Sequence, residues 1–205
     1  MLGRTKHIIQ INGQRVKVKT QPGNWLRTMD PVIIPISIHS VIHNDLFKIH
    51  SMLNVVKNNV AGRITVLMCE GAHLQTFKLQ CKDAEERIRR DTDMLIKHYS
   101  QYLKDCEVIH WNEFVNYHDS YNIFKTRINE LYDTDSEFRL KVQQDASYIK
   151  PAESDMLEQC IYLMIASEKG YKFEFYPGSR SKSMCYINDK NSTKLTRINV
   201  TLRQN

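Results

Sequence analysis

Residues 32–45 read V-I-I-P-I-S-I-H-S-V-I-H-N-D, a run of β-branched apolar side chains that ends in serines and histidines. A short apolar run without alternation predicts a strand over 32–38 that is covered on both faces, as in a parallel sheet. Side chains at the carboxyl end of such a strand line the crevice where ligands bind. From its position alone, Ser37 is a nucleophile, a hydrogen-bond donor or a small residue that fills the strand end.

Strand and helix patterns alternate along the rest of the chain. Strands are predicted at 63–69, 106–110 and 171–176, with a last strand over I-N-V-T-L-R at 198–203, after a loop at 178–193. Helices are predicted at 44–58, 83–104, 120–132, 135–149 and 153–168, the last one closed by Lys169-Gly170. This order predicts a single Rossmann-like α/β domain over residues 31–205, built on a mostly parallel sheet.

Residues 1–30 precede this pattern and are polar and basic. The segment K-H-I-I-Q-I-N-G-Q-R-V-K-V-K-T alternates around an Asn-Gly pair. Such a pair suits the tight turn between two antiparallel strands, so a lead-in with a short hairpin at Asn12-Gly13 is predicted.

The composition indicates one globular domain in a reducing compartment. The chain has 205 residues, of which 41% are hydrophobic, enough for a core without disulfides. Its five cysteines are widely spaced and form no C-x-x-C pair, which argues for free thiols in the cytoplasm and against a zinc ribbon. We expect neither a signal peptide nor a membrane span, because no apolar run is long enough.

Common catalytic and nucleotide-binding motifs are missing from the sequence. There is no G-x-G-x-x-G, no Walker lysine loop and no H-E-x-x-H, and Ser37 lacks the flanking glycines of a G-x-S-x-G elbow. His39, His43 and His50 are close in sequence, but helical spacing for two of them would fall where the chain leaves a strand. We therefore expect no metal site, and these histidines are taken as solvated or capping residues.

Two further polar residues are predicted near the same rim of the sheet as Ser37. Glu158 lies at the margin of the apolar stripe of helix 153–168, with Ser154 one turn before it. The carboxylate is either a solvated rim residue or a partly buried acid that holds an ammonium group or passes protons. Tyr176 ends a strand, because Pro177 and the glycine after it stop the ladder.

The net charge of +6 fits a polyanionic partner only if the charge is clustered. In helix 83–104 one stripe carries four basic residues, with Arg89 nearby, and would suit phosphates: Arg87, Arg90, Lys97 and Lys104. The alternative is an ordinary solvated face with i,i+4 pairs such as Glu86–Arg90 and Asp93–Lys97.

Taken in order, these segments resemble the tRNA-dependent cyclodipeptide synthases over roughly residues 30–178. I-S-I-H-S-V-I-H-N-D-L-F-K resembles that family's strand with a serine nucleophile, and A-E-E-R-I-R-R-D-T-D-M-L resembles its basic, tRNA-contacting helix. V-I-H-W-N-E-F and L-Y-D-T-D-S-E-F-R-L-K-V are similar to its middle section. M-L-E-Q-C-I-Y-L-M-I-A-S-E-K-G-Y-K-F-E-F-Y-P-G is similar to its helix with an essential Glu and its strand ending in Tyr. Ser40 and Pro177 resemble the subfamily with a Tyr-Pro pair.

The resemblance implies a fold like the catalytic domain of class I aminoacyl-tRNA synthetases, without their His-x-Gly-His and Lys-Met-Ser-Lys-Ser signatures. It implies two aminoacyl-tRNA substrates, no cofactor, and a ping-pong acyl transfer through an aminoacyl ester of Ser37. Glu158 would hold the ammonium group, Tyr176 would assist proton movement, and Ser154 would add a weaker hydrogen bond. The basic stripe would bind the acceptor stem. A monomer is expected.

The substrate pocket and the register of helix 153–168 leave alternatives. Val66 and Met68 either line a pocket, together with Ser40 and Pro177, or belong to the core. The family usually has Gly where Pro35 stands and Tyr where Ser154 stands. In a second alignment of this helix with the family, Tyr162 takes the place of that tyrosine, and Ala166 then stands where the family has its Glu. The first register, with Glu158 as the Glu, is preferred because the spacing from Glu158 to Tyr176 is near that of the family.

Two other functions are compatible with the sequence. One is a catalytically silent aminoacyl-tRNA or RNA-binding homologue, which Pro35 and Ser154 motivate. The other is an α/β hydrolase or acyltransferase unrelated to tRNA, against which the missing nucleophile elbow counts.

Overall fold

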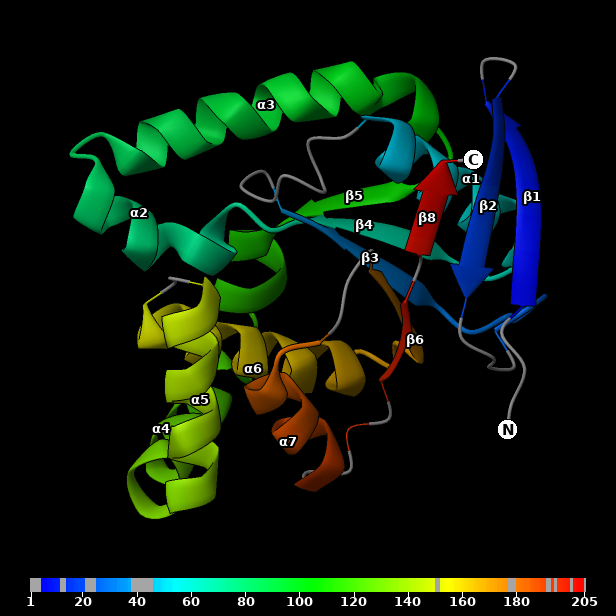
Figure 1. The fold of residues 1–205 in the computed structure, drawn as a ribbon. Coiled ribbons are helices and arrows are strands. Elements are labelled where there is room, and N and C mark those ends of the chain that lie inside the picture. The colour runs from blue at the N-terminus through cyan, green and yellow to red at the C-terminus, as the bar shows by residue number, and fades with distance from the viewer. Residues whose placement is uncertain are drawn as a thin grey trace.

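Five parallel strands form the central sheet of the computed structural model, in the order β5-β4-β3-β6-β7 (Figure 1). Their bounds are β3 (Val32–Ile36), β4 (Ile64–Met68), β5 (Glu107–His110), β6 (Phe173–Tyr176) and β7 (Thr196–Asn199). The structure describes residues 5–11, 14–20, 25–37, 46–149, 152–176, 180–190, 193, 195–199 and 201–204. The predicted Rossmann-like sheet is confirmed.

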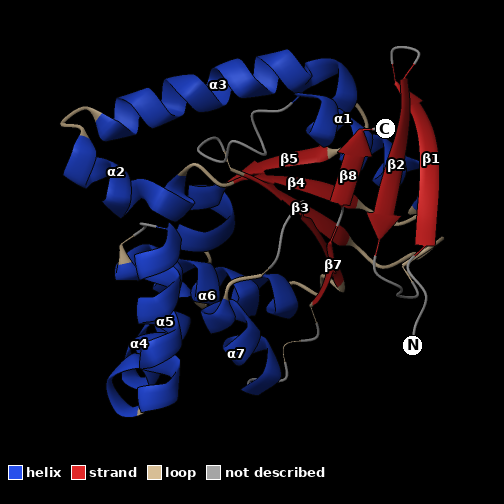
Figure 2. Cartoon of the chain, in the orientation of Figure 1, coloured by secondary structure: helices blue, strands red, loops and turns tan. Residues whose placement is uncertain are grey.

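Helices cover both faces of this sheet (Figure 2). One face packs against α1 (Leu46–Asn59) and α3 (Ala84–Leu103). The other face packs against a group of four helices: α4 (Tyr121–Thr134), α5 (Ser136–Ile149), α6 (Glu153–Glu168) and α7 (Lys182–Lys190). The short helix α2 (Leu74–Gln80) leads from the end of β4 to α3, and a π-helical turn, η2 (Asn112–Asn116), follows β5.

Strand β3 is buried on both sides. Ile34 and Ile36 lie in the apolar cluster with α1 and α3, whereas Ile33 lies in the cluster with α6. Side chains of successive strand residues point to opposite faces, which explains why this strand has no polar positions.

Helix α6 has its predicted bounds and is buried along most of its length. Gly170 has a φ of 84°, which glycine adopts without strain, and it ends the helix where the sequence predicted. At the other end, the buried carboxylate of Asp155 accepts hydrogen bonds from the backbone N–H groups of Gln75 and Thr76, at 3.2 and 3.1 Å. These are otherwise free N–H groups in the first turn of α2, so Asp155 fastens α2 to α6.

The N-terminal segment forms a separate antiparallel sheet in the order β1-β2-β8. The predicted hairpin is confirmed by the pairing of β1 (Thr5–Ile11) with β2 (Gln14–Thr20), although its two turn residues lie outside the described part. The prediction of one last strand at 198–203 was wrong. The chain instead forms β7 and then β8 (Thr201–Gln204), which pair in different sheets, since β8 adds to β2.

The loop predicted at 178–193 was also wrong, because much of it forms α7. Met184, Tyr186 and Ile187 are buried at helical spacing. Asp145 of α5 accepts hydrogen bonds from the N–H groups of Lys182 and Ser183, at 3.1 and 2.7 Å, which caps the first turn. In the described part of the chain, no helix is long and apolar enough to cross a membrane.

Candidate active site

Ser37 follows directly after β3 and is only 6% exposed. Ile36 pairs with Met68, and the N–H of Cys69 donates to the carbonyl of Ile36 at 2.8 Å. Ser37 is therefore next to the end of β4, at the carboxyl edge of the sheet. Continued alternation along the strand puts it on the same face as Ile33, toward α6.

Tyr176 is the last residue of β6, the strand on the other side of β3. Ile33 pairs with Glu174, so Glu174 and Tyr176 share the face of Ile33 and Ser37. The sheet grows toward β5 on one side of β3 and toward β7 on the other, which makes the β3–β6 boundary its topological switch point. In open α/β sheets ligands bind at that point, so the structure brings Ser37 and Tyr176 to the predicted edge.

Pro35 shapes this boundary. The bonds from Val32 to Arg63 and from Cys69 to Ile36 assign alternate residues of β3 to β4, which leaves Pro35 facing β6. A proline has no N–H and ends a ladder on that side. The β3–β6 pairing covers only Val32 and Ile33, whereas the β3–β4 pairing continues to Ile36. Pro35 thus coincides with the place where β3 and β6 stop pairing.

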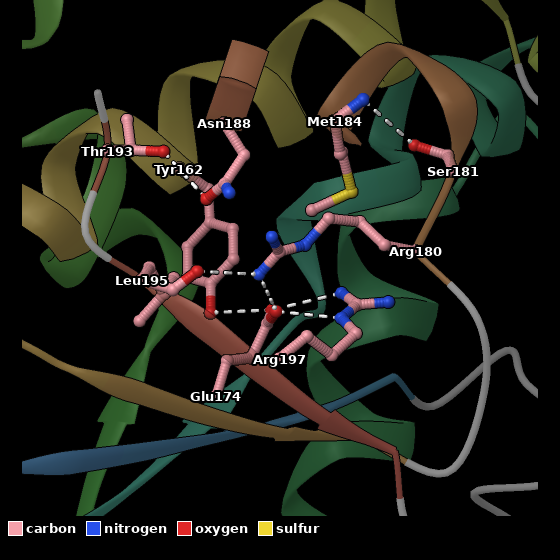
Figure 3. A network of polar contacts seen from close by, with 9 residues as sticks. All are labelled: Tyr162, Glu174, Arg180, Ser181, Met184, Asn188, Thr193, Leu195 and Arg197. Atoms are coloured by element: carbon pink, nitrogen blue, oxygen red, sulfur yellow. Dashed lines mark hydrogen bonds and ion pairs between the residues drawn. The ribbon is translucent and has the colours of Figure 1, made fainter. Parts of the chain in front are cut away.

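A buried ionic network lies on the same face (Figure 3). The carboxylate of Glu174 is fully buried and receives Arg197 Nε at 2.7 Å, Arg197 Nη2 at 3.0 Å and Arg180 Nη2 at 2.9 Å. The hydroxyl of Tyr162 on α6 donates to it at 3.1 Å. Burial alone would raise the pKa of Glu174, but the charges and hydrogen bonds of the two guanidinium groups outweigh burial and lower it to about 2.

This network extends to Tyr176. The Arg197 guanidinium carbon lies 4.4 Å from the centre of the Tyr176 ring, in a cation–π contact. Burial raises the pKa of the Tyr176 phenol to about 12, although Arg197 acts in the opposite direction. The phenol is therefore protonated at neutral pH. Sequence reasoning missed Glu174, Arg180 and Arg197, for which the only signal is an acid inside the apolar run F-E-F-Y.

The predicted Glu158 lies elsewhere on α6. Its Oε1 accepts a hydrogen bond of 2.7 Å from the Tyr121 hydroxyl of α4, and the contacts described for it do not include Ser37 or Tyr176. Its Oε2 is buried without a hydrogen-bond partner among the described residues, and burial raises the pKa of the carboxyl group. Ser154 is exposed on the first turn of the helix. Within α6, the Tyr162 hydroxyl is instead bonded to the Glu174 network on β6.

A cavity of about 770 Å³ opens at the carboxyl ends of β4 and β5, on the side of α3. Glu70, two residues after the end of β4, is 9% exposed. Its Oε1 lies 2.9 Å from His110 Nδ1 and accepts the N–H of Trp111 at 3.2 Å. Gly71 allows the close approach of Trp111, because a Cβ there would come within 2.4 Å of the indole. The lining residues are Glu70, Gly71, Leu74, Glu85, Glu86, Ile88, Arg89, Thr92, Asp93, His110 and Asn112.

The predicted basic stripe lies on the exposed side of α3. Arg87, Arg90, Lys97 and Lys104 are exposed, opposite the buried face that includes Ile88 and Tyr99. The ion pairs that the structure shows within this helix join Arg87 and Arg90 to Asp91, at 3.8 and 3.6 Å. Arg87–Asp91 is an i,i+4 pair, although not one of the two pairs named from the sequence. Arg89 points to the cavity side instead.

The remaining predicted residues fall in the core or outside the described part. Val66 and Met68 are fully buried in the apolar cluster under α1 and α3, which agrees with the core alternative. Ser40, Pro177, His39 and His43 lie outside the described residues. His50 stacks on Tyr102 with ring centres 3.9 Å apart. In the described ranges, no group of three or more His, Cys, Asp or Glu side chains could hold a metal ion.

Comparison with known proteins finds no matching family model and no matching curated protein. Solved structures do match. A cyclodipeptide synthase from Fluoribacter dumoffii superposes with a TM-score of 0.77 and 17% identity, covering 93% of this chain and 99% of that one. A cyclodipeptide synthase from Candidatus Glomeribacter gigasporarum, solved bound to Phe-tRNAPhe, has a TM-score of 0.69 and 16% identity over 85% of this chain and 89% of that one.

The tyrosyl-tRNA synthetase of Archaeoglobus fulgidus is a more distant match, with a TM-score of 0.54 and 10% identity, over 84% of this chain and 54% of that one. The agreement with the first two structures covers most of both chains. This chain therefore has the cyclodipeptide synthase fold, which is related to that of class I aminoacyl-tRNA synthetases.

Proposed function

We propose that this chain is a tRNA-dependent cyclodipeptide synthase, which joins the amino acids of two aminoacyl-tRNAs into a cyclic dipeptide. The observation that carries the proposal is the position of Ser37 and Tyr176 on adjacent strands at the switch point of a fold shared with such enzymes. An acyl group held in that crevice would meet a hydroxyl nucleophile and a proton-donating phenol.

The proposed reaction is a ping-pong acyl transfer through Ser37. Its Oγ attacks the ester carbonyl of the first aminoacyl-tRNA, the bond to the ribose oxygen breaks, and the released tRNA hydroxyl takes the proton that Ser37 loses. The amine of this aminoacyl-enzyme attacks the second ester, which releases the second tRNA and leaves a dipeptidyl ester on Ser37. Attack by the free amine on that ester closes the diketopiperazine and returns the serine hydroxyl.

Two polar residues receive roles in this scheme. The buried Oε2 of Glu158, which has no hydrogen-bond partner among the described residues, supports its role as acceptor for the substrate ammonium group. Tyr176, protonated at neutral pH and held under Arg197, would pass a proton during ring closure. Ser154 as a weaker hydrogen-bond donor, and Ser40 and Pro177 as substrate-site residues of a Tyr-Pro enzyme, stay predictions from the sequence.

Aminoacyl-tRNA is the proposed partner, and its ester arrives already activated, so the reaction requires no further cofactor. The exposed basic stripe of α3 would bind acceptor-stem phosphates. Asp91, which pairs with Arg87 and Arg90, neutralises only part of the charge of this stripe, because Lys97 and Lys104 lie further along the chain. We propose that the enzyme works as a cytoplasmic monomer.

A catalytically silent aminoacyl-tRNA-binding homologue is the second candidate. It is favoured by the position of Glu158, whose described contacts are to α4 rather than to Ser37. Such a protein would bind charged tRNA through α3 without forming an ester.

The test is incubation of the protein with charged tRNAs, followed by mass spectrometry of the intact protein and of the small-molecule products. The synthase proposal expects an aminoacyl adduct on Ser37 and cyclic dipeptides, both lost in Ser37→Ala. Ser147→Ala, an exposed serine on α5, is the matched control and should retain both products. Binding of charged tRNA without any adduct or cyclic dipeptide would favour the silent homologue instead.

A further inference from the structure

The cavity beside β4 and β5 contains a buried carboxylate oxygen without a protein donor. Glu70 uses its Oε1 for His110 and Trp111, whereas its Oε2 is buried and has no hydrogen-bond partner in the part of the chain that the structure describes. Buried polar atoms in native proteins are usually satisfied. An acceptor left open at the wall of a cavity indicates a place for a donor from a ligand.

Glu70 is also at the same carboxyl edge of the sheet as the candidate nucleophile, on the neighbouring strand. It directly follows Cys69, whose N–H bonds to the carbonyl of Ile36, the residue before Ser37. In Rossmann-type sheets, a carboxylate at the end of the strand beside the first one commonly accepts hydrogen bonds from ribose hydroxyls. Glu70 occupies that position, because β4 lies beside β3 and follows it in the chain.

The chemistry of an aminoacyl-tRNA requires its terminal ribose to lie close to Ser37 during the reaction. The ester that Ser37 attacks is carried by one hydroxyl of the terminal ribose, and the neighbouring ribose carbon carries a free hydroxyl. That hydroxyl is a hydrogen-bond donor, and it must lie close to Ser37 whenever the ester carbonyl is in reach of the serine. A carboxylate is the matching acceptor.

The cavity has the size and charge expected for a nucleoside rather than a phosphate. Its volume of about 770 Å³ lies within the range for small-molecule sites, roughly 300–1,000 Å³. Glu85, Glu86 and Asp93 on its α3 side would repel a phosphate but can accept hydrogen bonds from hydroxyl and amino groups. Arg89 is the guanidinium group among the lining residues and would face the 5′ phosphate, which joins a terminal nucleoside to the nucleotide before it.

We propose that this cavity binds the terminal adenosine of the tRNA, with Glu70 Oε2 accepting a hydrogen bond from the ribose hydroxyl next to the esterified one. The inference rests on the proposed function, since it places the leaving group of that reaction. Glu70 acts as a positioning residue: it holds the ribose so that the ester carbonyl faces Ser37.

The experiment compares two substrates: tRNA ending in adenosine and tRNA ending in 2′-deoxyadenosine, both esterified at the 3′ oxygen. The rate of adduct formation on Ser37 is measured for each with wild type and Glu70→Gln. Wild type should prefer the adenosine form by on the order of 100-fold, because without the 2′ hydroxyl the buried, charged Glu70 acceptor stays unpaired in the complex. In Glu70→Gln that preference should fall at least tenfold. Comparing preferences between proteins cancels the different intrinsic reactivity of the two esters.

Glu113→Gln, an exposed carboxylate on η2 outside the cavity, is the matched control and should retain the wild-type preference. Equal preferences in wild type and Glu70→Gln would overturn the inference while leaving the synthase proposal intact. If no charged tRNA gives an adduct, the proposed function fails. The inference is then judged by the binding of uncharged tRNAs with the two 3′ ends, for which equal affinities in wild type would overturn it.

Discussion

Glu174 and Glu70 are buried carboxylates on the two strands that flank β3, and their surroundings differ completely: Glu174 lies within β6, and Glu70 lies two residues beyond the end of β4. Glu174 receives two guanidinium groups and a phenol, so each of its oxygens is satisfied from within the protein. Glu70 has one satisfied oxygen and, within the described ranges, one oxygen at a cavity without a hydrogen-bond partner. Its pKa is raised by burial, whereas that of Glu174 is lowered to about 2.

The difference divides the site into two sides with different tasks. On the β6–β7 side the polar groups bind each other and fix the position of Tyr176 through Arg197. On the β4–β5 side the polar groups are incompletely paired and adjoin α3, with its exposed basic stripe. A saturated network gives rigidity, whereas an unsaturated one can accept a ligand. The predictions below test this division.

The largest expected effect comes from removing one partner of Glu174. Arg197→Met leaves a buried carboxylate with a single guanidinium, which should lower the free energy of unfolding by about 3–5 kcal/mol. Adding Glu174→Met should recover part of that loss, because the uncompensated charge is removed with it. Urea unfolding measures both variants. Arg63→Met, which removes an exposed pair with Glu107 at 3.8 Å, is the control and should cost at most about 1 kcal/mol.

The second prediction concerns the loss of stability at low pH, to which Glu174 should contribute. Because the pKa of Glu174 falls from an ordinary 4.5 to about 2 on folding, its contribution to stability is complete above pH of about 4.5. That contribution, about 3 kcal/mol, is lost as the pH falls through about 2. Unfolding free energies between pH 6 and pH 2.5 should therefore fall more steeply in wild type than in Glu174→Gln. Parallel pH profiles would contradict the assignment.

The third prediction concerns tRNA binding by the exposed basic stripe of α3. Lys97→Ala should weaken tRNA binding by roughly fivefold and reduce the slope of log affinity against log salt by roughly one unit, as expected for one lost phosphate contact. Lys190→Ala, on α7 at the β6–β7 side, should change neither. Titrations at several salt concentrations measure both. If the two variants behave alike, the assignment of α3 to tRNA binding is wrong.

The smallest effect on stability is expected at Glu158. Burial raises its pKa, so the ionised form is disfavoured in the folded state and stability falls as the pH rises through the folded pKa. Glu158→Gln should therefore be at least as stable as wild type at pH 7 in urea unfolding. It should still lose cyclic dipeptide formation, since an amide binds an ammonium group poorly. A variant that retained full activity would favour the Tyr162 register.

The sequence was sufficient to predict the parallel sheet and the position of two residues at its carboxyl edge. Apolar runs without alternation predicted buried parallel strands, and the rule that ligands bind at carboxyl strand ends predicted the shared edge of Ser37 and Tyr176. It was also sufficient for α6, whose stop at Gly170 depends on one residue's conformational freedom.

The ionic network could not be predicted because it depends on long-range register. Glu174 meets Arg197 only because β6 pairs with β7. It meets Arg180 because that residue, in the segment that connects the two strands, folds back toward β6. The open oxygen of Glu70 is equally invisible in sequence, since it depends on which donors fold toward it. Glu158 was assigned to the rim from its place on α6, but the structure joins it to Tyr121 of α4.

The position of β7 in the chain limits the order in which the two sides of the sheet can assemble during synthesis. This strand leaves the ribosome after the other four strands of the central sheet, and it carries the guanidinium that neutralises Glu174 and covers Tyr176. A nascent chain that ends before β7 would contain the nucleophile strand but an acid with one counterion fewer. Assembly of the Tyr176 side must therefore wait for the last strand of the sheet, whereas the Glu70 side can form much earlier.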